Sequence, residues 1–397
     1  TGMSSELQSL FFVLLVAAAS PIVAKILPRL QIPAVVFMIM GGIVIGPQGL
    51  GKAVESDVDL LSTLGLSFLF LLAGYELDLG LMRQDPGKLG IRAWLISAVI
   101  SVAVTALLYE VGFVQDFLAI AVALTTTALG TLLPIMRDAG ILESRIGPFI
   151  FAAGAVGEFL PIVAMALLLT GSGPLSGVVA LVGMAAATAL VLWLIRVVKQ
   201  RGWGDRLQLP EESTGQTSLR WTLVILAGLV LVANDFGLDV VLGAFLAGVV
   251  LRRWAPTQID NLERKLEAVG YGVFIPIFFV TSGMKLDVDS IVANPLRLVV
   301  FFGLLFAVRG LPALVVYRGH LNSLERWQMV FLTATALPLL VALSEVGLES
   351  GLMLPENAAA LVGAGALSVL VFPLVAVGLQ SRVHHAPVAE GRGPVTR

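Results

Sequence analysis

The sequence has no cysteine, few histidines and little charge. Without cysteine the chain forms no disulfide, thiolate metal site or thiol nucleophile. None of its three histidines (His320, His384 and His385) lies in an apolar run, so we expect no haem or zinc centre within a membrane. Charged residues make up only 13% of the chain, well below the share in soluble domains. The 25 Lys and Arg residues nearly balance the 27 Asp and Glu residues, which argues against a nucleic-acid partner.

Long apolar runs take the place of charge. Apolar residues make up 57% of the 397 residues, and the mean hydropathy is +0.95, which is more than a soluble core needs. Most of the runs are close to the length of a membrane-spanning helix. We therefore predict an all-α integral membrane protein with about 13 transmembrane helices. The predicted segments are 7–27, 33–50, 58–79, 89–112, 116–135, 147–170, 174–199, 219–236, 238–254, 268–284, 294–318, 325–347 and 357–380.

Positive charges indicate how these helices are oriented. With the N-terminus outside, 21 of the 25 Lys and Arg residues fall at the inner ends of the segments, as the positive-inside rule requires. The first segment lacks a basic leader, so we interpret it as a spanning helix and not as a signal peptide. We expect a multi-pass protein of the cell membrane, of bacterial inner-membrane type, with a cytoplasmic C-terminus.

Two short patterns recur at nearly the same offset. Residues 73–79 (AGYELDL) resemble residues 282–288 (SGMKLDV), 209 positions later, and residues 124–129 (LTTTAL) resemble residues 332–337 (LTATAL), 208 positions later. Seven helices separate the members of each pair, so the copies have opposite orientations. We predict two inverted six-helix repeats with crossed interrupted helices, as in secondary transporters. The predicted organisation is an extracellular end (1–6), a first repeat plus linker helix (7–199), a cytoplasmic loop (200–218), a second repeat (219–380) and a cytoplasmic tail (381–397).

Glu158 is the strongest candidate site residue. It lies in the middle of segment 147–170, roughly 17 Å from either end. An ionised, unpaired carboxylate at that depth costs several kcal/mol, so such residues are usually functional. Pro161 has no N–H for the carbonyl of Gly157, which leaves a free oxygen beside the carboxylate, and such oxygens suit a hard cation. The alternative is a protonated glutamate that bonds a neighbouring helix.

Arg309 is the second candidate. It lies nine residues before Arg318, roughly 13 Å from the inner interface, which is too far for its side chain to reach water easily. A buried guanidinium needs a partner, and Glu158 is the only carboxylate that we expect at a similar depth. The alternative is a structural ion pair that only fixes helix packing.

Threonines and prolines recur in mid-span in segments 116–135 and 325–347. We interpret them as two broken helices whose half-helix ends face each other. The alternative is that the threonine hydroxyls, including that of Thr125, bond back to their own helix. The predicted ion- and proton-binding residues are Glu158, Gly157, Thr126 and Thr127, with Arg309 as charge partner. The predicted crossover residues are Gly130, Pro134, Thr333, Thr335 and Pro338.

Five other polar residues are expected at helix ends, outside the site. Asn234 and Asp235 fall at the outer end of their segment, where a loop is expected. Glu76 and Asp78 end segment 58–79 at the cytoplasmic face, where we expect them to be solvated. Glu345 lies near the outer end of segment 325–347, where we expect at most a vestibule charge.

Four stretches are typical of one transporter family: 41–50 (GGIVIGPQGL), 70–78 (FLLAGYELD), 237–248 (GLDVVLGAFLAG) and 278–284 (FFVTSGM). Through them the sequence resembles the monovalent cation:proton antiporter superfamily, in the branch with bacterial sodium/proton exchangers and potassium efflux systems. The likeness covers nearly all of residues 7–380. It implies a dimerisation domain and a mobile core domain, with crossed, interrupted helices in the core.

The same resemblance implies where the ion-binding acid lies. In this family the acid is usually an Asp preceded by Asp, Asn or Gln, on the helix that matches segment 147–170. Here the pair is Gly157 and Glu158, which removes one polar side chain from the expected ion shell. The basic residue of the family, on the helix that matches segment 294–318, is Arg309 here.

We expect a secondary transporter that exchanges Na⁺ or K⁺ for H⁺ by alternating access, with 1:1 electroneutral stoichiometry and no cofactor. The expected partners are membrane lipid, monovalent cations and a second copy of the chain in a homodimer. One alternative is an antiporter-like fold repurposed as a membrane-embedded enzyme or a solute sensor. Another is a solute symporter, which would show two acids at the site, whereas the sequence makes only Glu158 evident.

Overall fold

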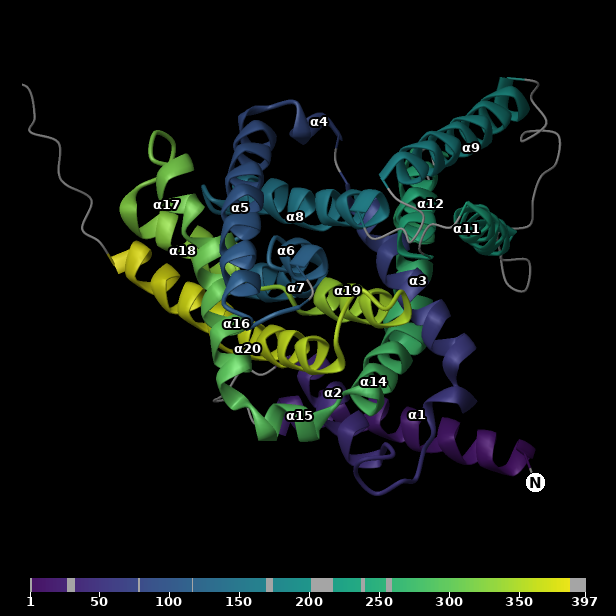
Figure 1. Ribbon diagram of the computed structural model, residues 1–397. Coiled ribbons are helices and arrows are strands. Elements are labelled where there is room, and N and C mark those ends of the chain that lie inside the picture. The colour runs from purple at the N-terminus through teal and green to yellow at the C-terminus, as the bar shows by residue number, and fades with distance from the viewer. Residues whose placement is uncertain are drawn as a thin grey trace, which may run out of the picture.

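The computed structural model describes residues 2–26, 33–77, 79–115, 117–168, 174–200, 217–236, 240–254 and 259–385. Within these ranges the regular elements are helices and no strand occurs (Figure 1). Ten of these helices are long and apolar enough to cross a membrane, so the prediction of an all-α, multi-pass membrane protein is confirmed. Most of the predicted loop at 200–218, the tail from residue 386 and Asp78 lie outside the described residues.

One group of helices, here called the first bundle, packs around α3 and lies at the right and bottom of Figure 1. Its close packing uses glycine where helices touch. A Cβ atom on Gly42 would lie 2.1 Å from the carbonyl oxygen of Val280, and one on Gly283 would lie 2.1 Å from that of Ile39, so these helices approach only because both residues lack a side chain. The first bundle comprises α1 (Gly2–Ile26), α2 (Ala34–Ile45), α3 (Asp59–Glu76), α9 (Pro174–Gln200), α11 (Thr217–Asp235), α12 (Val240–Trp254), α13 (Ile259–Val269) and α14 (Ile275–Lys285).

The remaining helices form a second bundle around α8 and α20, at the left and centre of Figure 1. Two spans that the sequence predicts as single segments are each divided here into two half-helices, α6 with α7 and α18 with α19. The second bundle comprises α4 (Leu79–Met82), α5 (Asp85–Glu110), α6 (Phe117–Ala123), α7 (Leu129–Asp138), α8 (Gly147–Leu168), α15 (Val288–Ala293), α16 (Pro295–Leu304), α17 (Pro312–Val316), α18 (Ser323–Thr333), α19 (Leu337–Glu349) and α20 (Pro355–His385).

Two spans contain a turn of π-helix just before a proline. The turn η2 (Gly270–Phe274) precedes Pro276 at the start of α14, and η3 (Leu305–Gly310) precedes Pro312 at the start of α17. Proline supplies no N–H to the preceding turn, so the hydrogen-bond ladder shifts by one residue there. The shift in η3 matters for the site because Arg309 lies within it.

Each of the thirteen predicted segments overlaps a helix, with differences at the ends. The largest difference is before residue 268, where the helix already begins at Ile259 as α13. Helix α13 carries the charged residues Glu263, Arg264 and Lys265. A search for apolar runs therefore excludes it from the predicted segment, although its other face is apolar. The number of membrane crossings and the inverted relation of the two repeats remain predictions.

Candidate functional site

The two interrupted spans meet at their breaks. Residues 124–128 separate α6 from α7, and residues 334–336 separate α18 from α19. The breaks are joined by a hydrogen bond of 2.7 Å from the backbone N–H of Ala128 to the carbonyl of Thr335. Two of the predicted crossover residues, Gly130 and Pro338, lie just after the interruptions, in the first turns of the half-helices that follow. Pro338 is tolerated there because an N–H in a first turn has no partner within the helix.

Helix α8 anchors one of the breaks. The N–H of Thr127 donates to the carbonyl of Gly157 at 3.0 Å. This is the carbonyl that Pro161 leaves without a partner inside α8, as the sequence predicts. Its role differs from the predicted one, however. It accepts a hydrogen bond from the break between α6 and α7 and so holds that break against α8.

Glu158 follows Gly157 in the middle of α8 and is only 7% exposed. Its Oε1 accepts a hydrogen bond of 3.3 Å from the backbone N–H of Gly130, in the first turn of α7. The N-terminus of a half-helix carries partial positive charge and unpaired N–H groups, so it stabilises an ionised carboxylate. The site therefore holds a buried acid against a helix end in place of a basic side chain.

Glu158 faces a small cavity between the two bundles. The cavity measures about 10 Å³, close to the least that holds one water molecule. The first bundle contributes residues of α3 together with Tyr271 of η2, and the second bundle contributes residues of α7, α8 and α19. The lining residues are Leu69, Phe70, Ala73, Glu76, Gly130, Glu158, Tyr271, Pro338 and Leu339.

Glu76 is in this cavity, which corrects the expectation of a solvated helix end. It is the last residue of α3, it is half-buried, and its Oε2 is buried without a hydrogen-bond partner among the described residues. Sequence analysis placed it at the interface because it stands at the end of an apolar run. The structure packs η2 against α3, and Tyr271 of η2 lines the same cavity as Glu76, so this end of α3 is covered by protein.

Arg309 lies beside Gly157 and does not pair with Glu158, which differs from the predicted charge pair. The side chain is 1% exposed. Its Nε donates to Thr127 Oγ1 at 2.8 Å and its Nη2 donates to the carbonyl of Ala153 at 2.9 Å. No ion pair joins it to a carboxylate within the described part of the chain. Neutral oxygens thus satisfy the guanidinium, and the helix end at Gly130 takes the place of the expected cation.

Gly157 is the point where these groups converge. A Cβ atom on this residue would lie 2.7 Å from both Cβ and Oγ1 of Thr127 and 2.8 Å from Nη2 of Arg309. Contacts this short do not occur between real side chains, so no larger residue fits without displacing its neighbours. The missing polar side chain at this position is therefore matched by an arginine that fills its space.

The threonines divide into one cross-link and four local hydrogen bonds. Thr127 Oγ1 donates to the carbonyl of Thr333 at 2.6 Å, which ties the two breaks together. Thr125, Thr126, Thr333 and Thr335 donate to carbonyls three or four residues earlier in their own segments. The alternative that the hydroxyls bond their own helix therefore holds for these four, including the predicted ligand Thr126. The backbone of Pro134 lies inside α7, and Gly130, one turn earlier in the same helix, is the residue that contacts Glu158.

Comparison with known proteins identifies the family. Residues 12–378 match the family described as sodium/hydrogen exchanger, transmembrane. The chain belongs to this family. It is 28% identical over 390 residues to YjbQ of Bacillus subtilis (strain 168), provisionally named an Na⁺/H⁺ antiporter, and the match covers 93% of this chain and 62% of YjbQ. It is 26% identical over 287 residues to the Na⁺/H⁺ antiporter of Enterococcus hirae, covering 69% of this chain and 72% of that protein.

The fold is shared with a solved member of the sodium/hydrogen exchangers. The structure of the sodium proton antiporter MjNhaP1 from Methanocaldococcus jannaschii at pH 8 superposes with a TM-score of 0.63 at 16% identity. The superposition covers 95% of this chain and 97% of that one. This chain spans less than two thirds of the length of YjbQ.

Sequence reasoning does not assign the two other polar residues of the cavity, Tyr271 and Glu76, to the site. Tyr271 lies in η2 with its side chain partly exposed, and no feature of the sequence marks it. Glu76 does carry a signal, since it belongs to the stretch 70–78 that is typical of the family. With Glu76 the site holds two acids, so the expectation of a single acid, which argued against a solute symporter, does not hold.

Proposed function

We propose that this protein exchanges a monovalent cation, Na⁺ or K⁺, for H⁺ across a membrane by alternating access. The observation that carries the proposal is the position of Glu158, a buried acid held at a half-helix N-terminus and facing a cavity between two bundles. The relatives named above are named as transporters of this kind, and nothing in the comparisons favours an enzyme or a sensor.

The proposed exchange follows from competition for one carboxylate. Glu158 binds either a proton or a cation, and the cavity has no room for both with their water. Because the cavity lies between the bundles, a movement of one bundle against the other exposes it first to one side of the membrane and then to the other. Each turnover then carries one ion in each direction.

Glu76 is proposed as a second oxygen ligand of the cation. Its buried Oε2 has no hydrogen-bond partner among the described residues, and a buried oxygen without a partner costs about 1–3 kcal/mol. A cation in the cavity would remove that cost and would place two carboxylates around one positive charge, which is the oxygen-rich environment that hard cations prefer. The cycle is electroneutral if Glu158 exchanges its proton while Glu76 keeps its charge state.

Thr127 and Arg309 are proposed as positioning residues. The Thr127 hydroxyl accepts a hydrogen bond from Arg309 Nε and donates one to the carbonyl of Thr333, and the Thr127 N–H donates to the carbonyl of Gly157. These bonds hold the break in α6 and α7 against α8, and so they place the Gly130 N–H at the carboxylate of Glu158. Arg309 therefore acts on the ion site through Thr127, and it does not act as a direct partner of the ion.

The orientation and assembly are also proposals. The distribution of Lys and Arg supports an outer N-terminus and a cytoplasmic C-terminus, which places the Glu76 end of α3 at the cytoplasmic side. The cavity would then lie toward the cytoplasm in the conformation seen here. Residence in the cell membrane and assembly as a homodimer are implied by the family resemblance.

The deciding experiment is Glu158→Gln in proteoliposomes, with an internal pH dye and gradients of Na⁺ or K⁺. We expect coupled exchange to be lost, because an amide neither binds a proton near neutral pH nor pairs with a cation. The thermal unfolding temperature in detergent should stay near that of the wild type. Glu110→Gln, at the exposed end of α5, is the matched control and should leave exchange unchanged. Wild-type exchange by Glu158→Gln would refute the site.

A further inference from the structure

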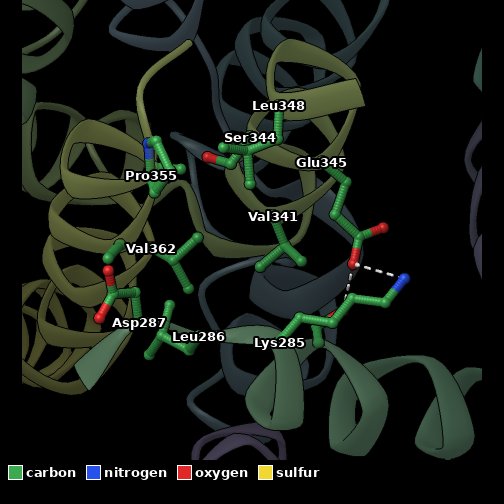
Figure 2. A pocket seen from close by; sticks show the side chains of 12 residues that line it. Lys285, Leu286, Asp287, Val341, Ser344, Glu345, Leu348, Pro355 and Val362 are labelled. Atoms are coloured by element: carbon green, nitrogen blue, oxygen red, sulfur yellow. Dashed lines mark hydrogen bonds and ion pairs between the residues drawn. The ribbon is translucent and has the colours of Figure 1, made fainter. Parts of the chain in front are cut away.

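A second charged pocket lies between the two bundles, at the opposite end of α14 from η2. It measures about 50 Å³ and is lined by the end of α14, one face of α19 and the start of α20. Figure 2 shows Lys285 reaching up to Glu345, with Val341 beside them. The residues of the first cavity and the proposed ion site are not part of this pocket.

An ion pair crosses from one bundle to the other in this pocket. Lys285 Nζ of the first bundle lies 3.9 Å from Glu345 Oε1 of the second bundle, and the hydroxyl of Ser282 donates to the same oxygen at 3.2 Å. The side chains of Lys285 and Glu345 are 31% and 19% exposed. Lys285 is also 3.4 Å from Asp59, which belongs to its own bundle and is 63% exposed. The ammonium is therefore shared between a partner across the interface and a partner near water.

The two pockets lie along one face of α19. Pro338 lines the first cavity, while Val341, Glu345 and Leu348 line the second. These positions are spaced by three, four and three residues, so they form one stripe on the helix. From Pro338 to Glu345 the helix rises roughly 10 Å. Val341 is buried and is the residue of the stripe that stands between the two pockets.

A polar group in this pocket has no partner. Ser344 is 2% exposed, its Oγ is buried without a hydrogen bond among the described residues, and it lines the pocket next to Glu345 (Figure 2). Together with Glu345 and Ser282 it offers a carboxylate and two hydroxyls, an oxygen set suited to a monovalent cation or a water that accompanies one.

We propose that this pocket is a vestibule of the exchange path on the side of the membrane opposite the Glu76 end of α3, here called the far side. In this second cation site the ammonium of Lys285 occupies the place of the transported ion. The inference rests on the proposed function. In the conformation seen here the ion pair between Lys285 and Glu345, here called the latch, holds the two bundles together. Opening of this side requires Lys285 to move to Asp59, which frees Glu345, Ser282 and Ser344 to receive the cation on its way to or from Glu158.

Thiol labelling tests the latch without relying on transport. The chain has no cysteine, so Ser344→Cys introduces a single target for a membrane-impermeant thiol reagent added on the far side. We expect Lys285→Gln to speed its labelling by roughly fivefold, the size expected for loss of one partly exposed ion pair, and Lys285→Arg to keep the wild-type rate. Asp287→Asn is the matched control, since Asp287 lines the same pocket but caps α15 through Ser290. Equal rates in Lys285→Gln and Asp287→Asn would overturn the latch.

Side-specific kinetics test the cation site. We expect Glu345→Gln to raise the apparent KM for Na⁺ or K⁺ presented on the far side by roughly fivefold, and to leave the KM on the Glu76 side unchanged. An equal change on both sides, or none, would overturn the second site. If the wild-type protein catalyses no exchange, the proposed function fails by itself, and the labelling result still decides whether Lys285 closes this side.

Discussion

Gly157→Ala is the sharpest test of the site geometry, because one methyl group meets three atoms of the network. The added Cβ would lie 2.7 Å from Cβ and Oγ1 of Thr127 and 2.8 Å from Nη2 of Arg309. Neither neighbour moves freely. Thr127 is tied to Thr333 at 2.6 Å and to Gly157 itself by its N–H, and Arg309 is 1% exposed with both of its contacts inside the protein.

The cost follows from what must shift. Overpacking of a filled interior costs about 1–3 kcal/mol, and a hydrogen bond to a charged group contributes about 1.5–3 kcal/mol. Because the methyl group can push aside either Arg309 or Thr127, we count one such bond and expect a total of roughly 2.5–6 kcal/mol. If the strain falls on the alignment of Gly130 with Glu158, exchange falls by at least about 60-fold, since each 1.4 kcal/mol is a factor of ten.

The measurements are thermal unfolding in detergent and cation-driven proton exchange in proteoliposomes. Two glycines serve as controls, because a Cβ on Gly228 in α11 or Gly303 in α16 would meet nothing within 4 Å. Alanine there should leave the unfolding temperature unchanged or raise it, since alanine favours helix over glycine by up to about 1 kcal/mol. A Gly157→Ala protein that matches these controls in stability and exchange would show that Arg309 and Thr127 do not fill the space beside Gly157.

Two further predictions concern charge movement and the threonine cross-link. The exchange rate in proteoliposomes should not change with an imposed potential, because one carboxylate trades one proton for one cation; a net charge would respond by about 2.3 kcal/mol per 100 mV, and such a response would show that Glu76 titrates as well. Thr127→Val should destabilise the protein by roughly 2–3 kcal/mol, since it leaves an N–H of buried Arg309 unpaired. Thr127→Ser should restore stability, and Thr126→Val should cost only about 1 kcal/mol, because the Thr126 hydroxyl bonds only the carbonyl of Ala123; equal losses at both threonines would contradict the cross-link.

Apolar length and proline placement determine what the sequence predicts well. A run near 20 apolar residues can be satisfied in a membrane only as a helix, so the segments and the all-α class follow directly. A proline removes one N–H wherever it stands, so the free carbonyl of Gly157 and the interruption before Pro338 also follow from local chemistry. In these cases the physical cause lies within the segment itself.

Contacts between segments are harder to predict. Equal depth in the membrane makes Arg309 a plausible partner for Glu158, but depth does not give the direction in which a side chain points around its helix. The π-helical turn at Leu305–Gly310 rotates Arg309 toward Thr127 and Ala153. Glu76 fails for a related reason: hydropathy marks the end of its run, while only packing shows that neighbouring helices cover that end.

The relation between Gly157 and Arg309 gives a steric reason why no polar side chain precedes the acid in this chain. The resemblance implies a polar residue before the acid, and here the volume of that residue holds Nη2 of Arg309 and Oγ1 of Thr127. The arginine requires a glycine at position 157 because a larger residue there would clash with it, and the glycine requires the arginine because a void would otherwise be left beside it. In this chain the positioning residues therefore lie in η3 and at the break before α7, and the N-terminus of α7 holds the acid. Glu76 is the other carboxylate among the residues that line the cavity with Glu158, and under the proposed function it is the residue that we expect to influence ion selectivity.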